Sequence, residues 1–359
     1  MQTNSSNSSN PPNAADQIRT DVDALQRELH DLHSAALLSD LKNEFAELDQ
    51  GITSMPLRIQ QIRARQYVFG RLLETQADDL AARWRSQRGT VQAQLLSQSN
   101  LLQSLVQPLD TRIAMLSGAL PSQAQINALR VELSSIKNKC SAAENAISNL
   151  FSAVKSEFQA FKVKIGLIEG TLSFAEEAIF GFLPGESIVA AVQAIWTQDE
   201  KEDRDDPKGV LFLTDQRLLF EQNEEVATKK VLFVTTERKK IQNLLFEVPA
   251  TLVEDVKSSK QGLFKNEDNL HFQFASGAFA RQARLHIFNQ DCVEWQKTIQ
   301  RVKTREIDAD RFAPVDEALL EKVRNAPTQC PSCGGAITKP VLRGMEAITC
   351  EFCGKSIRL

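Results

Sequence analysis

From residue 14 to about residue 178 the hydrophobic pattern is helical, and glycine and proline are sparse. Apolar residues recur three and four positions apart, which is the spacing that places them on one face of a helix. The skip between Leu32 and Leu38 breaks the register of the first run, and Gly51 and Pro56 predict a turn. The apolar members of this run are Ile18, Val22, Leu25, Leu29, Leu32, Leu38, Leu41, Phe45, Leu48 and Ile52.

A second apolar run begins at Ile62 and continues without a predicted break to SGALPS at 117–122, and a third, more regular run follows. The third run steps by three and four, with two successive steps of four at Leu150, Val154 and Phe158. Two apolar positions in seven form a narrow seam that must be buried against another helix. Because short breaks between long helices favour antiparallel neighbours, we predict an elongated antiparallel coiled coil of two or three helices. A compact bundle is the alternative, but helices this long rarely fit in one.

After Phe182 the pattern changes to short apolar segments bounded by polar or glycine-containing stretches. Such segments predict the strands of an antiparallel sheet or barrel. The predicted strands lie in 183–196, 209–222 (a hairpin with a polar turn at Thr214–Gln216), 229–237, 244–256, 269–277 and 283–289. An amphipathic helix in 290–306 closes the region, and one face of it carries Cys292, Trp295, Ile299 and Val302.

Six or seven strands closed by one helix resemble the pleckstrin-homology-like (PH-like) fold in its bacterial PH/GRAM form. The matching segments are LPGE at the first strand, GVLFLTDQRLLF as the second hairpin, and Trp295 on the closing helix. The resemblance covers about 180–303. It implies a β-barrel with a C-terminal helix that binds lipid head groups or proteins, and it does not imply catalysis.

Four of the six cysteines lie in the last thirty residues as two Cys-x-x-Cys pairs, each followed by glycine. A Cys-x-x-Cys turn points both sulfurs at one ion, and two such turns complete a tetrahedron with Zn–S distances of about 2.3 Å. Glycine after each pair allows the chain to turn tightly with a positive φ. The segment AITKPVLRGMEAIT between the pairs predicts two short strands with a bend at Pro340 and Gly344. The predicted ligands are Cys330, Cys333, Cys350 and Cys353.

This segment, 328–359, resembles a zinc ribbon. It is too short to form a sufficient core, so a bound ion must supply its folding energy. Four sulfurs leave no position for water, and we therefore predict one structural Zn²⁺ ion and no catalytic metal. A thioredoxin-like redox pair would need a βαβ context, and paired disulfides would need an oxidising compartment. The bases expected to offset the net −2 charge of a Zn–thiolate centre are Lys339, Arg343, Lys355 and Arg358.

Charge and composition set limits on location and chemistry. The net charge is −4, so no overall field directs the chain to nucleic acid or acidic lipid. No signal peptide and no membrane-spanning run is evident, which predicts a cytoplasmic protein. Residues 1–13 are polar and predict a disordered tail, while 304–327 predict a charged linker with a short helix in 314–324. Cys140 and Cys292 lie on apolar helix faces and are interpreted as core residues.

Phosphate-binding loops, nucleophile elbows and metalloprotease motifs are absent from the sequence, and we predict that the protein is not an enzyme. In lipid-binding PH domains the loop after the first strand is usually basic. Here residues 198–208 carry six acidic and three basic side chains, a net −3 that opposes phosphoinositide binding at this loop. A weaker basic candidate for lipid binding consists of Lys257, Lys260 and Lys265.

The sequence thus predicts a multidomain α + β protein: a disordered tail (1–13), a coiled-coil helical domain (14–178), a PH/GRAM-like domain (180–303), a linker (304–327) and a zinc ribbon (328–359). The leading functional hypothesis is a non-enzymatic scaffold or adaptor that binds protein partners and self-associates through the coiled coil. One alternative is a peripheral membrane protein that binds anionic lipid through the PH-like domain. The other is a nucleic-acid-associated protein acting through the ribbon, whose net charge of +2 is too small to predict such binding.

Overall fold

The computed structural model describes residues 14–117, 121–197, 202–231, 234–262 and 266–359. It divides into two compact units. The helical unit comprises Met1–Pro56 and Gln76–Phe161, and the sheet unit comprises Leu57–Thr75 and Lys162–Leu359. The predicted tail, 1–13, lies outside the described residues. Among the described helices, none combines the length and the apolar character needed to cross a membrane.

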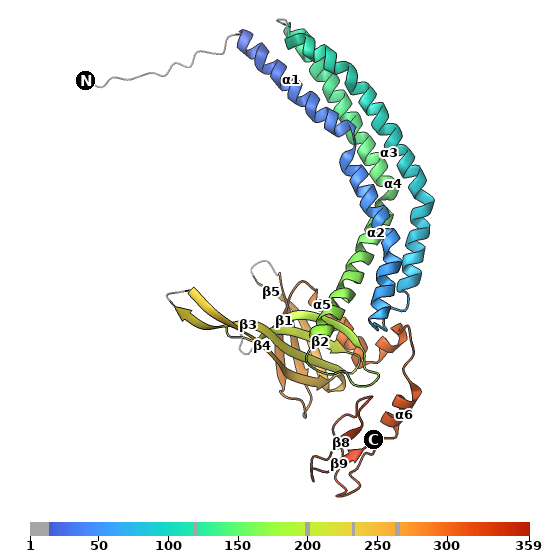
Figure 1. Cartoon of the computed structure of the whole chain (residues 1–359), viewed down its shortest axis with the longest axis vertical. Coiled ribbons are helices and arrows are strands. Elements are labelled where there is room, and N and C mark those ends of the chain that lie inside the picture. Colours follow the sequence, from blue (N-terminus) through green and yellow to red (C-terminus); the bar gives the residue numbers. More distant parts are fainter. Residues whose placement is uncertain (1–13, 118–120, 198–201, 232–233, 263–265) are drawn as a thin grey trace, which may run out of the picture. The chain divides into compact units, whose positions relative to one another are not determined.

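The helical region contains α1 (Ala14–Ala36), α2 (Ser39–Ala64), α3 (Leu73–Ser117) and α4 (Gln123–Glu177). Within the helical unit, α3 and α4 lie side by side and α1 followed by α2 lies along them (Figure 1). Ion pairs join Arg83 to Glu157 and Arg112 to Glu132, so α3 and α4 run in opposite directions. Most residues of the apolar seam predicted from the sequence are buried, whereas Leu150 is exposed. Antiparallel packing is therefore present, and supercoiling of the helices stays a prediction.

The turn predicted at Gly51 and Pro56 is wrong, because α2 is continuous through both residues. A Cβ atom built on Gly51 would lie 2.2 Å from Cζ of Phe158 on α4. Glycine is present here because the Phe158 ring occupies the space of a side chain. The break in this part of the chain is between α1 and α2, where Leu38 has a φ of 52°. The Ser99 hydroxyl of α3 donates to the Ala36 carbonyl at this break, at 3.2 Å.

The second predicted run, which begins at Ile62, is also interrupted. Residues 65–72 form the connection between α2 and α3, with a φ of 62° at Gln66 and 69° at Gly70. The Arg63 guanidinium donates to the carbonyl oxygens of Tyr67, Phe69 and Gly70 at 2.8, 2.6 and 2.8 Å. Hydrogen bonds from Arg63 to three carbonyls of the turn do not change the spacing of the apolar residues. The hydrophobic pattern therefore predicted a continuous helix.

The seam of α4 passes through Phe151 and not through Leu150. Phe151 is fully buried, whereas Leu150 is 43% exposed. The two successive steps of four therefore fall at Ala143, Ile147 and Phe151 instead of the predicted positions. The Phe151 ring packs against the Trp84 ring of α3 in a T-shaped arrangement, with ring centroids 6.3 Å apart. Two adjacent apolar residues satisfy the same period, and the partner helix decides which one is buried.

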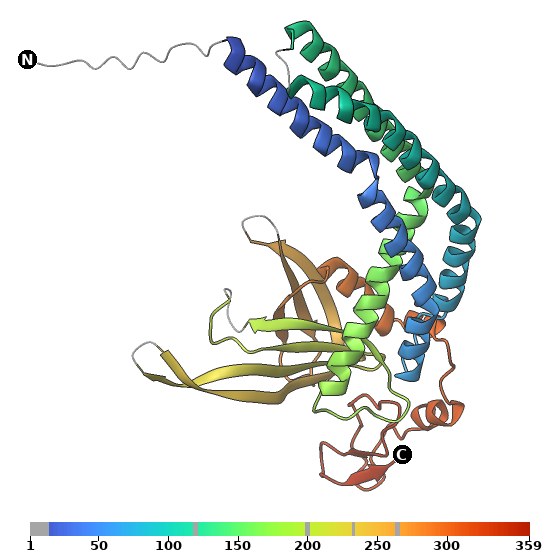
Figure 2. The ribbon, with the colours of Figure 1, turned by 45° about the horizontal axis from the view of Figure 1, so that its top comes forward.

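The sheet unit contains one seven-stranded antiparallel sheet in the order β4-β3-β2-β1-β7-β6-β5. Strand β1 pairs with both β2 and β7 and so joins the two halves. Strands β3 and β4 form a long hairpin that extends beyond β2 (Figure 2). The strands are β1 (Ile188–Thr197), β2 (Lys208–Thr214), β3 (Arg217–Val231), β4 (Val234–Pro249), β5 (Val253–Gln261), β6 (Glu267–Phe274) and β7 (Gln282–Ile287).

Two predicted strands differ from the structure. The segment 229–237 contains the end of β3 and the start of β4, so it forms the two arms of the hairpin near its tip. The segment 244–256 contains the end of β4, the short 3₁₀ helix η1 (Ala250–Leu252) and the start of β5. Pro249, which has no N–H for a ladder, stands where β4 ends. Apolar runs show where strands occur but do not show where one strand gives way to the next.

The remaining elements close the sheet and connect it to the C-terminus. Helix α5 (Cys292–Lys303) packs against β5 and β6, and its apolar face is buried as predicted. Asp291 caps this helix by accepting from the Val293 amide at 2.7 Å. The 3₁₀ helix η2 (Glu306–Asp310) and α6 (Glu317–Arg324) follow. The ribbon, which we define as residues 328–359, contains β8 (Ala347–Thr349) and β9 (Ser356–Arg358).

Candidate metal centre and its docking on the sheet

The four C-terminal cysteines form one cluster. One thiol or thiolate sulfur from each of Cys330, Cys333, Cys350 and Cys353 lies within 4.8 Å of the others. The Cys330–Cys353 and Cys333–Cys350 sulfur pairs are 3.8 and 3.7 Å apart. A tetrahedron with metal–sulfur arms of about 2.3 Å has edges of about 3.8 Å, whereas a disulfide bond is about 2.05 Å. The cluster therefore has the dimensions of a four-sulfur metal site.

Both cysteine pairs are held by the same backbone turn. Gly334 N–H donates to the Cys330 carbonyl at 2.8 Å, and Gly354 N–H donates to the Cys350 carbonyl at 2.9 Å. Both glycines have positive φ, 73° and 72°, as their position after each pair predicts. The backbone N–H groups of Ser332 and then Cys333 point at the Cys330 sulfur and lower the pKa of that thiol to about 6. The backbone N–H groups of Cys353 and Phe352 lower the pKa of Cys350 in the same way, whereas hydrogen bonds with the neighbouring thiols, that of Cys353 first, raise the pKa of Cys333. The two turns therefore favour the thiolate, the form that binds metal, at Cys330 and Cys350.

The ribbon has little else to hold it together. Its buried core consists of Cys330, Ile348, Cys350 and Ile357, with four further apolar side chains only partly buried around it. Such a core is too small to stabilise a fold without a cross-link or a metal. The donor set, the sulfur distances and the small core together fit a structural divalent ion. Four protein ligands complete a tetrahedral shell, so these residues offer no position for substrate.

The sequence predicted two strands between the cysteine pairs, but only β8 lies there, and its partner β9 lies after the second pair. Strand β8 precedes the second pair and β9 follows it, and they pair as Ala347 with Arg358 and Thr349 with Ser356. After the first pair there is only an isolated bridge between Gln329 and Ala336. The second Cys-x-x-Cys turn, at Cys350 and Cys353, therefore connects the two strands of the hairpin. The rest of the chain between the two cysteine pairs lies outside this hairpin and can contact the sheet.

The predicted role of Arg343 as a base beside the metal centre is wrong. Its side chain is 2% exposed and forms an ion pair with Asp215, which is fully buried in the turn between β2 and β3. The Arg343 guanidinium also donates to the Gly185 carbonyl at 3.0 Å. Another of the predicted bases, Lys339, pairs with Glu351 at 3.5 Å. The residues next to Arg343 in the sequence do not indicate that its ion-pair partner is Asp215, a residue in a distant segment.

The β2–β3 turn receives the ribbon through backbone contacts as well. Gln216 forms two hydrogen bonds with the Arg343 backbone: its side-chain oxygen accepts from the Arg343 N–H at 2.5 Å, and its amide nitrogen donates to the Arg343 carbonyl at 3.0 Å. Gly344 follows with a φ of 84°, and a Cβ atom there would lie 2.2 Å from the Pro184 carbonyl oxygen. The bend at Gly344 therefore serves close approach to the sheet.

Asp215 joins three segments of the sheet unit. Besides Arg343, its carboxylate binds Arg311 from the chain after η2 and accepts from the Ser187 N–H at 3.0 Å. Arg311 also lies over the Phe69 ring at 4.8 Å, so the same network reaches the α2–α3 connection. The linker and the ribbon are thus fixed to the sheet by one buried carboxylate.

A second buried ion pair lies beside the first. Glu186 binds Arg217 twice, at 2.9 and 2.6 Å, and accepts from Thr214 at 2.6 Å. Arg217 extends onward to Glu247 at 2.7 Å. Asp215 and Gln216 lie in LTDQRLLF, and Glu186 in LPGE, the two segments on which the PH-like resemblance was based. The sequence identified these segments, but it did not show that they form the surface on which the ribbon docks.

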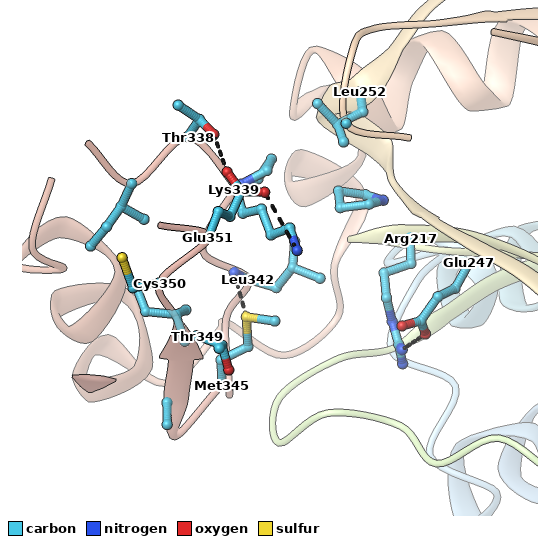
Figure 3. A pocket seen from close by; sticks show the side chains of 16 residues that line it. Arg217, Glu247, Leu252, Thr338, Lys339, Leu342, Met345, Thr349, Cys350 and Glu351 are labelled. Atoms are coloured by element: carbon cyan, nitrogen blue, oxygen red, sulfur yellow. Dashed lines mark hydrogen bonds and ion pairs between the residues drawn. The ribbon is translucent and has the colours of Figure 1, made fainter. Parts of the chain in front are cut away.

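A groove of about 420 Å³ lies between the ribbon and the sheet (Figure 3). Leu342, Met345 and Thr349 line it from the ribbon, and Arg217, Glu247 and Leu252 line it from the sheet. No sequence pattern predicted this groove, because its two sides come from segments at least 60 residues apart in the sequence.

The predicted lipid-binding lysines are mostly paired within the fold. Lys260 binds Asp291 at 2.8 Å and Asp268 at 3.4 Å, and these contacts, with the Asp291 hydrogen bond as the largest, raise the pKa of Lys260. Lys257 is exposed and lies 3.6 Å from Asp255. Lys265 lies outside the described residues. Lys260 is therefore part of the cap of α5 and not a free cation.

The other predicted core cysteines are buried. Cys140 is 1% exposed and Cys292 is fully buried. Burial, followed by the neighbouring Asp268, raises the pKa of Cys292 to about 11. Burial also raises the pKa of Cys140. Both thiols are therefore protonated at neutral pH and have the character of apolar core groups.

No family model matches the chain, and no curated protein matches it. Among solved structures, the chain is similar to the Vps36 N-terminal PH domain at 16% identity and a TM-score of 0.25, covering 35% of this chain and 86% of that chain. It is similar at 16% identity and a TM-score of 0.22 to a DUF1696 family protein with a PH domain from Shewanella loihica, covering 38% of this chain and 92% of that one. It is similar at 11% identity and a TM-score of 0.25 to the DH/PH domains of PDZ-RhoGEF, solved with activated RhoA, covering 80% of this chain and 95% of that one. At TM-scores this low, the likeness carries no argument about what this chain binds.

Proposed function

We propose that the protein is a non-enzymatic adaptor that binds partner proteins through its PH-like sheet and its ribbon, with the ribbon held by one Zn²⁺ ion. The observation that carries the proposal is the buried ion pair between Arg343 and Asp215. A buried ion pair contributes little net stability compared with apolar packing, but it fixes the orientation of the groups it joins. The ribbon and the sheet would then present one composite surface to a partner.

The proposed metal is zinc because the donors are four sulfurs at tetrahedral spacing. Thiolate ligands select Zn²⁺ over the hard cations Mg²⁺ and Ca²⁺, which require oxygen ligands. Free thiolates persist in a reducing compartment, so a cytoplasmic location belongs to the same proposal. Self-association through the helical unit belongs to it as well, and the support there is the set of exposed apolar side chains Leu96, Leu101 and Val131.

Protein binding is favoured over lipid binding by the charges on the sheet. Lys260, one of the three predicted lipid ligands, is already neutralised by two carboxylates. In the ribbon, Arg343 is buried against Asp215, which leaves Lys339, Lys355 and Arg358 against Glu346 and Glu351. These side chains carry a net +1, which the net −2 of a Zn–thiolate centre would more than offset. That charge gives nucleic acid little to bind.

The proposal is tested by crosslinking the zinc-loaded full chain in native cytosol, identifying the crosslinked proteins, and rebinding each one as a purified component. We expect at least one partner that rebinds directly and crosslinks to the sheet or the ribbon. Anionic vesicles are tested in parallel by flotation at low and physiological salt. The proposal fails if no purified protein rebinds, or if the chain binds vesicles alone.

A further inference from the structure

We propose that the groove between the ribbon and the sheet binds an extended peptide segment of a partner protein, which adds as a third strand to the open edge of β8 and places a basic side chain against Glu247. This inference rests on the proposed adaptor function and names its mode of binding. Its support comes from the backbone of β8, the apolar lining of the groove and the charge at the sheet side.

The hydrogen-bonding pattern of the ribbon hairpin shows that one edge of β8 is open. Leu359 N–H donates to the Glu346 carbonyl and Cys350 N–H to the Lys355 carbonyl, both at 2.9 Å. In an antiparallel ladder, alternate residues face the partner strand, so Ile348 bonds to Ile357 in the same way. Ala347 and Thr349 must then turn their N–H and C=O groups away from β9.

The groove runs along this open edge. Its lining includes all three residues of β8, Ala347 to Thr349, and the next two residues, Cys350 and Glu351, but no residue of β9. A peptide that pairs with Ala347 and Thr349 would satisfy up to four backbone groups that the hairpin leaves outside its own ladder. Addition of a strand to a sheet edge obtains affinity from these main-chain bonds and specificity from side-chain pockets.

Apolar side chains line both walls of the groove. The ribbon contributes Leu342 and Met345, and the sheet contributes Leu252 (Figure 3). Pro249 of the sheet also lines the groove. Successive side chains of a strand point to opposite faces, so every second residue of the peptide would face this lining. The peptide therefore needs apolar residues two positions apart.

The charges that line the groove indicate that the peptide also needs a basic residue. Arg217 is 8% exposed and is shared between Glu186, which is fully buried, and Glu247, which is 53% exposed. Two carboxylates share one guanidinium, so the sheet side of the groove carries an excess negative charge at Glu247. On the ribbon side, Lys339 and Glu351 neutralise each other at 3.5 Å. A lysine or arginine in the peptide would complete the pairing at Glu247.

The experiment uses the full, zinc-loaded chain and a phage library of random peptides of about ten residues. Peptides enriched on the wild-type chain are synthesised with a fluorophore, and their affinities are measured by anisotropy. The key variant is Thr349→Pro, because proline removes an N–H that points into the groove and is tolerated on an edge strand. The matched control is Ser356→Pro in β9, the cross-strand neighbour of Thr349, whose N–H points to the opposite edge.

We expect enriched peptides with apolar residues two apart and one basic residue. Thr349→Pro should weaken their binding about tenfold, since it removes a backbone bond and adds a ring at the edge. Ser356→Pro should leave binding within about twofold. Glu247→Gln should weaken binding and reduce its salt dependence, and N-methylation of the pairing amide in the peptide should abolish binding to the unmodified protein.

The inference is overturned if no peptide is enriched, or if enriched peptides bind Thr349→Pro as tightly as the wild type. If Thr349→Pro loses its zinc, the N-methylated peptide and Glu247→Gln decide the question, since unchanged affinity in both would contradict it. The adaptor proposal has a separate outcome. Partner proteins that rebind equally well to Thr349→Pro would preserve that proposal and place binding elsewhere on the molecule.

Discussion

Replacement of Arg343 by methionine tests how firmly the ribbon is held on the sheet. Methionine keeps most of the apolar volume of the side chain and removes the contacts to Asp215 and to the Gly185 carbonyl. Removing one partner of a buried ion pair typically costs about 3–5 kcal/mol. Asp215 would keep Arg311 and the Ser187 N–H, so we expect the lower value, about 3 kcal/mol.

A loss of about 3 kcal/mol raises the population of the undocked ribbon roughly a hundredfold, because each 1.4 kcal/mol is a factor of ten. Hydrogen exchange measured by mass spectrometry reports this opening at individual peptides. We expect the amides of 341–345 and 185–187 to exchange roughly a hundredfold faster in Arg343→Met than in the wild type. The amides of β6 and α5 should keep their protection, since they lie outside the docking surface.

Arg358→Met is the matched control, because Arg358 lies in the same ribbon and is exposed. It should change exchange in 341–345 by less than about twofold. Asp215→Asn should be more damaging than Arg343→Met, because it leaves Arg311 and Arg343 facing each other without their shared carboxylate. The reasoning is refuted if Arg343→Met speeds exchange in these segments by no more than the Arg358 control does.

Three further predictions concern packing and thiol chemistry. Gly344→Ala should lower the stability of the sheet unit by about 2 kcal/mol or more, against about 1 kcal/mol for Gly334→Ala, because only the former adds a backbone clash to positive φ; urea unfolding would contradict this with equal losses. Gly51→Ala should lower the melting temperature of the helices by overpacking, whereas Gly89→Ala, with open space around it, should raise it, and circular dichroism would detect a reversal. Cys292, with a pKa of about 11, should resist iodoacetamide at pH 8 in the folded chain, where roughly a thousandth is thiolate; rapid labelling seen by mass spectrometry would contradict its burial.

The helical region, the β region and the cysteine cluster follow directly from local sequence signals. A three-and-four period, short bounded apolar runs and paired Cys-x-x-Cys turns each depend on neighbours within a few residues. The errors occur where distant residues decide. Gly51 resembles a helix breaker until the Phe158 ring is placed against it, and Leu150 and Phe151 are equivalent until Trp84 selects one of them.

The candidate site divides in the same way. The four ligands of the cluster could be predicted from spacing, because the turn geometry is local. The docking of the ribbon could not, because Arg343 and Asp215 are joined across 128 positions of sequence. The open edge of β8 and the groove beside it depend on that docking, so they also could not be predicted.

The measurement that tests the central claim most directly is native mass spectrometry of the freshly purified full chain, repeated with Cys333→Ser. We predict one zinc ion bound to each wild-type chain, with all four cysteines of the ribbon reduced, and loss of that ion in the variant. A wild-type chain that carries no metal, or whose mass shows two disulfides in place of the ion, would contradict the account.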